Sequence, residues 1–448
     1  MMFELDNQTI KDLDIFGNSS NQNSVFDYFN HTHTKGGQDA LSQMMRSPIN
    51  DINILTFRKD AIQYFGDNKV AIQFNSSQFD FIEHYLKLNI PVLKDNYMDA
   101  YSAHLSNLLK AKNDYHIISK GIEYLIDVLR TQSIFFQTLD LTKMPSEMSN
   151  RISSLSELLE DKLMKSALSN KAKLSPRSIN KFDQIFRSKL KNSVRDFLDL
   201  LYLFDALGSV SKVYINNGLC LPEYTDSKTP TVAINGLYHP LVKNAIKNDV
   251  ILDESQNLFF LTGPNMAGKS TFLKSIGLSI HLSHLGFPIN ADKMKTSIYN
   301  GLVSTINLSD DISRGYSHFY SEVKRVKETA IKIKTHGRVF VLCDELFRGT
   351  NVKDAFEGST LIISALSKIK NCTFFISTHI TEVAVELKNS KNIQFKYLDA
   401  KLVNNTPEFT YKLCPGISEV RLGLYILKNE KITDILDEAY QISADENH

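Results

Sequence analysis

Apolar residues recur with helical spacing in the first half of the chain. Three stripes follow this spacing, at 118–129, 155–163 and 194–204. Their members are Ile118, Ile122, Leu125 and Leu129; Leu155, Leu158, Leu159 and Leu163; and Val194, Phe197, Leu198, Leu201 and Phe204. Because residues three and four positions apart lie on one face of a helix, each stripe predicts a helix that packs against its neighbours. We therefore expect residues 1–222 to form a helical domain.

The pattern changes after 218–230, GLCLPEYTDSKTP, which contains two prolines and several turn-forming residues. Short apolar runs replace the stripes: NLFFLTG at 257–263, RVFVLCDE at 338–345 and CTFFISTH at 372–379. Each run has the length of a strand and is rich in β-branched or aromatic residues, and helical stretches separate the runs. This alternation predicts a second domain, 223–448, built on a mainly parallel sheet with crossover helices.

Composition narrows the class of protein. The 448 residues suffice for two or three domains, and the net charge of +1 means that any surface for a polyanion must be a local patch. The cysteines form no CxxC pair, which argues against a disulfide framework or a zinc site and is typical of the reducing cytoplasm. The polar amino terminus is unlike a signal peptide, and no apolar run approaches the roughly 20 residues of a membrane helix. We therefore expect a cytoplasmic protein without membrane contact.

The segment GPNMAGKS, 263–270, matches the pattern GxxxxGK[ST] between a predicted strand and a predicted helix. Glycines allow main-chain N–H groups to surround phosphate oxygens, and the following helix adds its positive end. The Lys269 ammonium can reach the outer phosphates, and the Ser270 hydroxyl can coordinate Mg²⁺. The predicted nucleotide-binding residues are Gly263, Pro264, Asn265, Met266, Ala267, Gly268, Lys269, Ser270 and Thr271.

Two further strand ends carry polar side chains. Asp344 and Glu345 follow a buried run, where Asp344 would complete the Mg²⁺ shell and Glu345 would orient or deprotonate the attacking water. His379 ends the next run and would donate a hydrogen bond to the γ-phosphate. The alternatives are an acidic pair on the surface and a histidine that only satisfies the end of its strand.

Taken together, these motifs resemble the MutS family of mismatch-repair ATPases. The string TGPNMAGKST at 262–271 is the most specific match. Further matching segments are YHPLV at 238–242, NDV at 248–250, DDI at 310–312, Ser317 to Glu322, RGT at 348–350 and 411–428, with weaker matches at 5–16, 36–48 and 203–214. The resemblance implies an α plus α/β fold, in which an all-helical core and lever domain precedes a P-loop ATPase domain of the ABC type. The match at 5–16 resembles the start of the family's core domain, so the mismatch-reading domains that precede this core in the family are not expected here.

The family resemblance also implies an activity. ATP, with Mg²⁺, would be bound and hydrolysed at a composite interface of a homodimer formed through the ATPase domains. Ser317 of one subunit would face the γ-phosphate held by Lys269 of the other, unless Ser317 is an ordinary loop serine. Turnover would be coupled to DNA binding of the mismatch-repair type. Two alternatives stay open: a nucleotide-dependent dimerisation switch that acts on a protein partner without DNA, and a remnant that binds nucleotide without hydrolysing it.

Two features bear on how the ligands would be held. Ala245 stands where the family commonly has an aromatic residue that stacks on adenine, and Phe347 stands where a glycine is usual. The segment 162–195 contains ten Lys and Arg residues and one acid, Asp183. If these cations share a face, they would neutralise DNA phosphates in a sequence-independent manner. The alternative is a solvated helix face.

Overall fold

The computed structural model describes residues 3–17, 23–70, 72–94, 113–169, 174–306, 318–403, 406–418 and 431–445. The chain divides into two compact units. We call one the sheet unit, which comprises Met1–Tyr28, Pro48–Leu55 and Leu219–His448. We call the other the helical unit, which comprises Phe29–Ser47 and Thr56–Gly218. None of the helices in the described part of the chain is long and apolar enough to cross a membrane.

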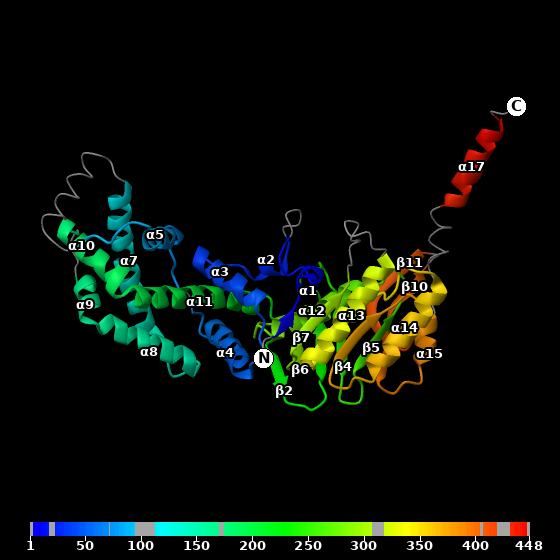
Figure 1. The fold of residues 1–448 in the computed structure, drawn as a ribbon. Helices are drawn as coiled ribbons and strands as arrows, with labels where there is room; N and C mark the ends of the chain where they lie inside the picture. Colours follow the sequence, from blue (N-terminus) through cyan, green and yellow to red (C-terminus); the bar gives the residue numbers. More distant parts are fainter. Residues whose placement is uncertain are drawn as a thin grey trace. The chain divides into compact units, whose positions relative to one another are not determined.

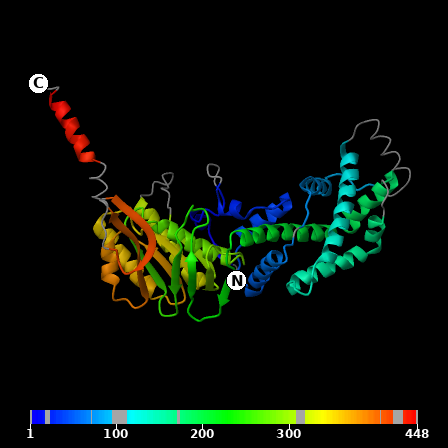
Figure 2. The same cartoon turned by 180° about the vertical axis from the view of Figure 1, so that it is seen from behind.

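The helical unit is built from α-helices with one π-helical turn (Figure 2). Its elements are α3 (Lys35–Arg46), most of α4 (Ile52–Asp67), α5 (Ser76–Leu86), α7 (Asn113–Thr138), α8 (Ser146–Glu160), α9 (Lys162–Leu168), α10 (Pro176–Gln184), η1 (Ile185–Lys189) and α11 (Lys191–Asn216). The first and third apolar stripes lie on α7 and α11, and all of their members are buried. These two predicted helices are confirmed, and their stripes form the core of the unit.

The second stripe does not form one helix, so that prediction is wrong. Helix α8 ends at Glu160, and Leu163 belongs to α9. Asp161 takes φ −56° and ψ 138°, and its carboxylate accepts hydrogen bonds from the N–H groups of Leu163 and Met164. An aspartate at this position caps the next helix and ends the previous one. Of the stripe, only Leu155 is fully buried.

The sheet unit is centred on a sheet that is covered by helices (Figure 1). This sheet has seven strands in the order β1-β7-β8-β9-β5-β10-β11. Its strands are β1 (Glu4–Leu5), β5 (Leu258–Thr262), β7 (Gly301–Thr305), β8 (Val339–Asp344), β9 (Thr373–Ser377), β10 (Ile393–Val403) and β11 (Thr406–Pro415). All neighbours are parallel except β10 and β11. The mainly parallel sheet predicted from the three apolar runs is therefore confirmed. The carboxyl ends of β5, β8 and β9 lie at the same edge of this sheet.

Helices complete the layers around this sheet. They are α1 (Asn7–Asp12), α2 (Val25–Phe29), α12 (Lys269–Ser283), α13 (His318–His336), α14 (Val352–Ser367) and α15 (Thr381–Leu387), and α17 (Ile432–Asp445) follows near the carboxyl terminus. The middle strands are buried on both faces, with the ring of Phe375 stacked on those of Phe259 and Phe340 at centroid distances of 4.8 and 5.3 Å. Strands buried on both faces read as continuous apolar runs, which explains why the sequence pattern reveals them.

Two parts of this unit were not foreseen. A second sheet has the order β2-β6-β3-β4, with strands β2 (Pro222–Thr225), β3 (Val232–Leu237), β4 (Asn248–Leu252) and β6 (Lys293–Ser297). The amino-terminal strand β1 pairs with β7 in the large sheet, with Glu4 opposite Gly301. The first residues of the chain thus belong with the carboxyl-terminal half rather than with the helices expected over 1–222.

Candidate nucleotide site

The loop between β5 and α12 needs glycine at two positions. Gly263 has φ +146° and Gly268 has φ +95°, which side-chain-bearing residues rarely adopt. A Cβ atom on Gly263 would lie 3.3 Å from the carbonyl oxygen of Leu398, and one on Gly268 would lie 3.2 Å from the ring of Tyr411. Backbone conformation therefore favours glycine at both positions of the GxxxxGK[ST] pattern, and the space for a side chain is tight at each.

The first turn of α12 is left without a side-chain cap. Gly268 is the N-cap residue and has no side chain to accept a hydrogen bond from the helix. The first N–H group that bonds back within this turn is that of Phe272, to the carbonyl of Gly268 at 2.9 Å. The preceding N–H groups, those of Lys269, Ser270 and Thr271, have no helical acceptor and carry the positive end of the helix dipole. This arrangement suits an anion at the loop.

Lys269 lies over the main chain of the loop. Its ammonium donates hydrogen bonds to the carbonyl oxygens of Gly263 at 2.9 Å and Pro264 at 3.2 Å. It is also 4.0 Å from the Glu345 carboxylate. Burial lowers the pKa of Lys269, while the carboxylates of Glu345 and Asp344 act in the opposite direction. The only mobile cation of the motif is thus held at the loop by weak neutral acceptors.

Asp344 joins three parts of the site. One of its carboxylate oxygens accepts a hydrogen bond from the hydroxyl of Ser270 at the start of α12, and the other accepts one from the hydroxyl of Ser377 at the end of β9. Burial raises the pKa of Asp344, and the two hydroxyl hydrogen bonds oppose that rise. The structure therefore brings the two predicted Mg²⁺ ligands, Ser270 and Asp344, into direct contact.

Sequence reasoning missed Ser377. It lies two positions before His379 in the run FFISTH, and register places it directly opposite Asp344 on the neighbouring strand. The signal available in the sequence was the shared polar end of two adjacent buried runs. Using it required knowing that β8 and β9 are neighbours, which no motif states.

Glu345 lies among basic side chains. Its Oε1 is 3.8 Å from the Nδ1 of His379, and its Oε2 is 3.4 Å from a guanidinium nitrogen of Arg348. Its main-chain N–H donates to the carbonyl of Ser377 at 3.0 Å, and its φ of +56° is unusual for a glutamate. The strained backbone at a strand end turns this carboxylate toward Lys269 and His379. Of the three predicted catalytic residues, the structure brings Glu345 and His379 together, whereas Ser317 lies outside the described residues.

The loop after Glu345 is fixed by α13. The carboxylate of Glu322 accepts hydrogen bonds from the N–H groups of Arg348 and Gly349, each at 3.2 Å. Phe347 takes φ +60°, and its ring packs against Phe319 with 5.8 Å between centroids. The positive φ explains why glycine suits position 347, and the aromatic contact shows what stabilises phenylalanine there instead.

A cavity of about 310 Å³ opens beside the loop. Its lining includes Ala245, Thr271 and the half-exposed ring of Tyr411. Ala245 contributes only a methyl group, and the aromatic rings of the lining are those of Tyr238, Phe272 and Tyr411. The carbonyl of Tyr411 accepts a hydrogen bond from the Asn248 amide at 2.9 Å. The sequence assigned no role to Tyr411 by itself. Its ring places an aromatic surface in the same cavity as the methyl group of Ala245.

His239 forms part of the cavity wall. Its Nδ1 accepts a hydrogen bond from the N–H of Leu241 at 3.3 Å, and its Nε2 is buried. Burial lowers the pKa of His239 to about 4, and the nearby Lys274 ammonium acts in the same direction. The ring is therefore neutral near pH 7, with Nε2 carrying the hydrogen.

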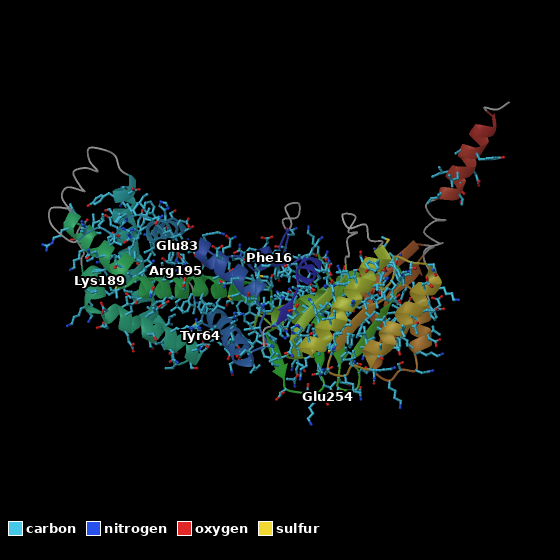
Figure 3. The ribbon with its side chains drawn as sticks, in the orientation of Figure 1. Phe16, Tyr64, Glu83, Lys189, Arg195 and Glu254 are labelled. Carbon is cyan, nitrogen blue, oxygen red and sulfur yellow. The ribbon has the colours of Figure 1, made fainter. Side chains whose placement is uncertain are left out.

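The basic segment, residues 162–195, does not expose all of its cations. Arg187 is buried and forms two hydrogen bonds with the Asp183 carboxylate, at 2.7 and 2.6 Å. Arg195 pairs with Glu83 at 2.9 Å, both residues being labelled in Figure 3, and Lys165 pairs with Glu160. The prediction that the cations share one face is wrong for Arg187, because its charge is neutralised inside the helical unit.

Several cations of the segment remain at the surface. Lys162, Arg177, Lys189 and Lys191 are exposed. Lys171 and Lys173 lie outside the described residues. The exposed residues occupy α9, α10, η1 and the start of α11. A polyanion that binds this surface would therefore meet fewer positive charges than the number of Lys and Arg residues in the segment.

Comparisons with known proteins show which proteins this chain is similar to. Residues 259–445 match the family model for MutS domain V. The DNA mismatch repair protein MutS of Thermotoga maritima is 27% identical over 259 residues, which are 57% of this chain and 32% of the relative. The DNA mismatch repair protein MSH3 of Candida glabrata is 26% identical over 391 residues, 83% of this chain and 37% of the relative. The MutS protein of Petrotoga mobilis is 30% identical over 244 residues, 54% of this chain and 29% of the relative. The chain thus spans about a third of the length of these curated relatives.

Proposed function

Because the chain belongs to the MutS family, we propose that its sheet unit is a magnesium-dependent ATPase that couples ATP hydrolysis to a DNA transaction of the mismatch-repair type. The observation that carries the proposal is the contact between Ser270, at the start of α12, and Asp344, at the end of β8. The hydroxyl and the carboxylate meet at the start of α12, next to the loop whose N–H groups suit an anion. This combination is what a nucleotide with Mg²⁺ requires.

The donor set fits Mg²⁺ with a triphosphate. Among the described residues no group of three or more His, Cys, Asp or Glu side chains could hold a metal ion by itself. Magnesium is commonly held by one or two protein oxygens, with water and phosphate oxygens completing its shell, so Ser270 and Asp344 suffice. When bound, Mg²⁺ would neutralise charge that develops on the phosphate oxygens. Ser377 would keep the second oxygen of Asp344 engaged, so that the other faces Ser270.

The remaining residues would act on the triphosphate and on water. Lys269 would exchange its two carbonyl acceptors for phosphate oxygens, which are stronger partners for an ammonium. Glu345 would accept a hydrogen bond from the attacking water and orient it, and His379 would donate to the γ-phosphate. The cavity lined by Tyr411 would hold the adenine ring.

We further propose that the site is completed by a second copy of the chain, with Ser317 of the partner subunit facing the γ-phosphate. The support is indirect: the family relationship, and the exposure of Met266 and Val352 beside the loop and after Arg348, at 73% and 77%. Exposed cations at Lys162, Arg177, Lys189 and Lys191 would contribute sequence-independent contacts to DNA phosphates.

Two substitutions test the chemistry. Lys269→Ala should abolish ATP binding, measured by equilibrium binding of a fluorescent ATP analogue. Glu345→Gln should bind ATP with Mg²⁺ but turn it over at least roughly a hundredfold more slowly, because the carboxylate that orients water is lost. Lys353→Ala and Glu254→Gln, at exposed positions of the same unit (Glu254 is labelled in Figure 3), serve as matched controls. Turnover by Glu345→Gln at the rate of the unaltered protein would refute the role of Glu345.

A third measurement addresses the partner. ATP turnover and DNA retention are compared with duplex, branched and mismatched DNA at two salt concentrations. The double variant Lys189→Glu/Lys191→Glu should weaken retention and reduce its salt dependence without changing turnover in the absence of DNA. Absence of binding to every DNA, together with ATP-driven dimerisation, would instead favour the switch that acts on a protein partner.

A further inference from the structure

A second cavity, of about 430 Å³, lies in the helical unit. Its walls come from the end of α4 and the residues after it, from the second half of α11, and from the segment that contains His31 and His33. Every lining residue belongs to the helical unit, so the cavity is a property of that unit alone. Its volume falls in the range of small-ligand sites. Neither the ATPase chemistry nor the basic segment makes use of it.

The charge of this cavity is positive. Lys69 and Lys212 line it, and the described residues include no ion-pair partner for either ammonium. Asp205 is the one acid among the lining residues, and its carboxylate is already engaged. It accepts hydrogen bonds from the N–H groups of His33 and Thr34 at 2.9 and 2.8 Å and from the Thr34 hydroxyl at 2.7 Å. The two lysines outnumber this one carboxylate, so the lining keeps a net positive charge toward an anion.

Flat rings lie beside these cations. The rings of His33 and Phe74 are close to parallel, with an interplanar angle of 27° and 6.0 Å between centroids, and both residues are partly exposed. The buried rings of Phe65 and Phe204 meet edge to face at 5.3 Å and form the floor. A ligand with a planar ring system gains most from such surfaces, whereas a bare inorganic anion gains nothing from them.

Two residues of the lining are not of the type that their backbone conformation favours. Gly208 lies inside α11, where glycine costs about 1 kcal/mol relative to alanine, yet a Cβ atom there would meet nothing closer than 3.8 Å. Packing does not demand this glycine, and its absent side chain deepens the cavity. Lys69 has φ +49° just after α4, a position that favours glycine. Both exceptions to local preference fall in the same cavity, one leaving space and the other adding charge.

We propose that this cavity binds a nucleotide unit, with its phosphate against Lys69 and Lys212 and its base against Phe74 and His33. The unit is either a free mononucleotide or one residue of single-stranded DNA, since both present the same base and phosphate. This site is separate from the triphosphate site of the sheet unit and does not depend on ATP hydrolysis.

The chain contains no tryptophan, which makes a specific reporter available. Phe74→Trp places a single indole in the cavity wall, and Phe81→Trp places one at a contact with Tyr124 on α7 that is not part of the cavity. Both are made in the Lys269→Ala chain, so that binding at the triphosphate site does not contribute. Adenosine monophosphate and a short oligothymidylate are titrated while indole fluorescence is followed.

We expect saturable quenching of the Phe74→Trp reporter and none of the Phe81→Trp reporter. Tighter binding of the oligonucleotide identifies single-stranded DNA as the source, and equal or tighter binding of the mononucleotide identifies a free nucleotide. Lys212→Glu should weaken binding at least roughly tenfold, as loss and reversal of a phosphate contact does. Gly208→Leu, which fills the cavity from a helix position that leucine favours, should abolish it.

Lys69→Gly separates binding from structure. It removes the charge and also relieves the positive φ, so it should raise the melting temperature while it weakens nucleotide binding. A lysine with only a structural role would show no change in affinity. The proposal is overturned if neither probe quenches the Phe74→Trp reporter, if both reporters respond alike, or if Lys212→Glu binds as the unaltered chain does.

Discussion

Acidification should destabilise the sheet unit through one buried histidine. His284 lies at the end of α12 and is fully buried. Its Nδ1 donates to the carbonyl of Ile280 at 2.8 Å, and its Nε2 accepts the N–H of Tyr299 at 2.9 Å. Both nitrogens are engaged in the neutral tautomer, so a second proton would convert the acceptor into a donor that faces another donor. Burial accordingly lowers the pKa of His284 to about 4.

The size of the effect follows from linkage. The pKa of a histidine in the unfolded chain is 6.5 and that of folded His284 is about 4, so between these values the unfolded state binds the proton more readily. Stability is complete above the unfolded pKa and is lost as the pH falls toward the folded pKa. From about pH 7 to about pH 5 the loss is roughly 2 kcal/mol, and full protonation would cost about 3 kcal/mol. His239, whose pKa is also about 4, should add a similar loss.

Urea unfolding followed by circular dichroism at a series of pH values measures this loss. His284→Gln should be less stable at every pH, but its stability should fall less steeply from about pH 7 to about pH 5, by roughly 2 kcal/mol. His116→Gln, at an exposed position of α7, controls for the replacement of a histidine. Identical pH profiles for the unaltered chain and His284→Gln would show that the ring is not held neutral, and the reasoning would fail.

Three further predictions concern the candidate site. Ser377→Ala should raise the Mg²⁺ concentration needed for nucleotide binding by roughly 10- to 100-fold, because a buried oxygen of Asp344 loses its donor; a fluorescence titration with Mg²⁺ that shows no shift would contradict this. Tyr411→Ala should weaken ATP binding about tenfold and Tyr411→Phe should not, if the ring stacks on a base. Gly277→Ala should lower the free energy of unfolding by about 2 kcal/mol, since its Cβ would lie 2.4 Å from Leu342 in the contact of α12 with β8, and an unchanged urea midpoint would refute this.

The sequence predicted the strands that appear as continuous apolar runs. Strands β5, β8 and β9 are buried on both faces, so they appear as continuous apolar runs whose ends point to the site. The small sheet gives no such signal. Its strand β6 reads KMKTS, with exposed and buried residues alternating over only the first four positions, and β1 has only two residues. Such short segments become strands because neighbours supply their hydrogen bonds, and those neighbours are distant in sequence.

The candidate site shows the same limit. Lys269 and Ser270 follow from a local motif, whereas Ser377 and Tyr411 enter only through strand order and chain folding. Position 347 departs from the preference for glycine at a positive φ, and a second position compensates for it. Phe347 takes the positive φ that favours glycine, and Gly358 on α14 leaves room for its ring, since a Cβ at 358 would lie 3.1 Å from it. Glycine is thus found at position 358 instead of position 347. Neither position, read alone in the sequence, shows that the two are connected.

The amino-terminal segment is bound to the end of β7 and to α13 by charged and polar side chains. The Asp12 carboxylate accepts hydrogen bonds from the Ser304 hydroxyl at 2.8 Å and from the Ile306 N–H at 2.9 Å, at the end of β7. Asp6 pairs with Arg325 of α13 at 2.7 Å, and Arg325 also donates to the carbonyl of Ser304 at 2.6 Å.

These contacts hold the residues on both sides of 307–317, the stretch that contains Ser317, against α1. Burial would raise the pKa of Asp6, but the Arg325 and Lys332 cations hold it well below its usual value, so the pair stays ionised and resists separation. The same segment is bound to α12 by the ion pair of Asp14 with Lys274 at 2.6 Å. It then continues along the chain into Phe29, where the helical unit begins. Any movement of α12 or α13 on nucleotide binding must therefore either break these charged hydrogen bonds or move the contacting residues of the amino-terminal segment as well.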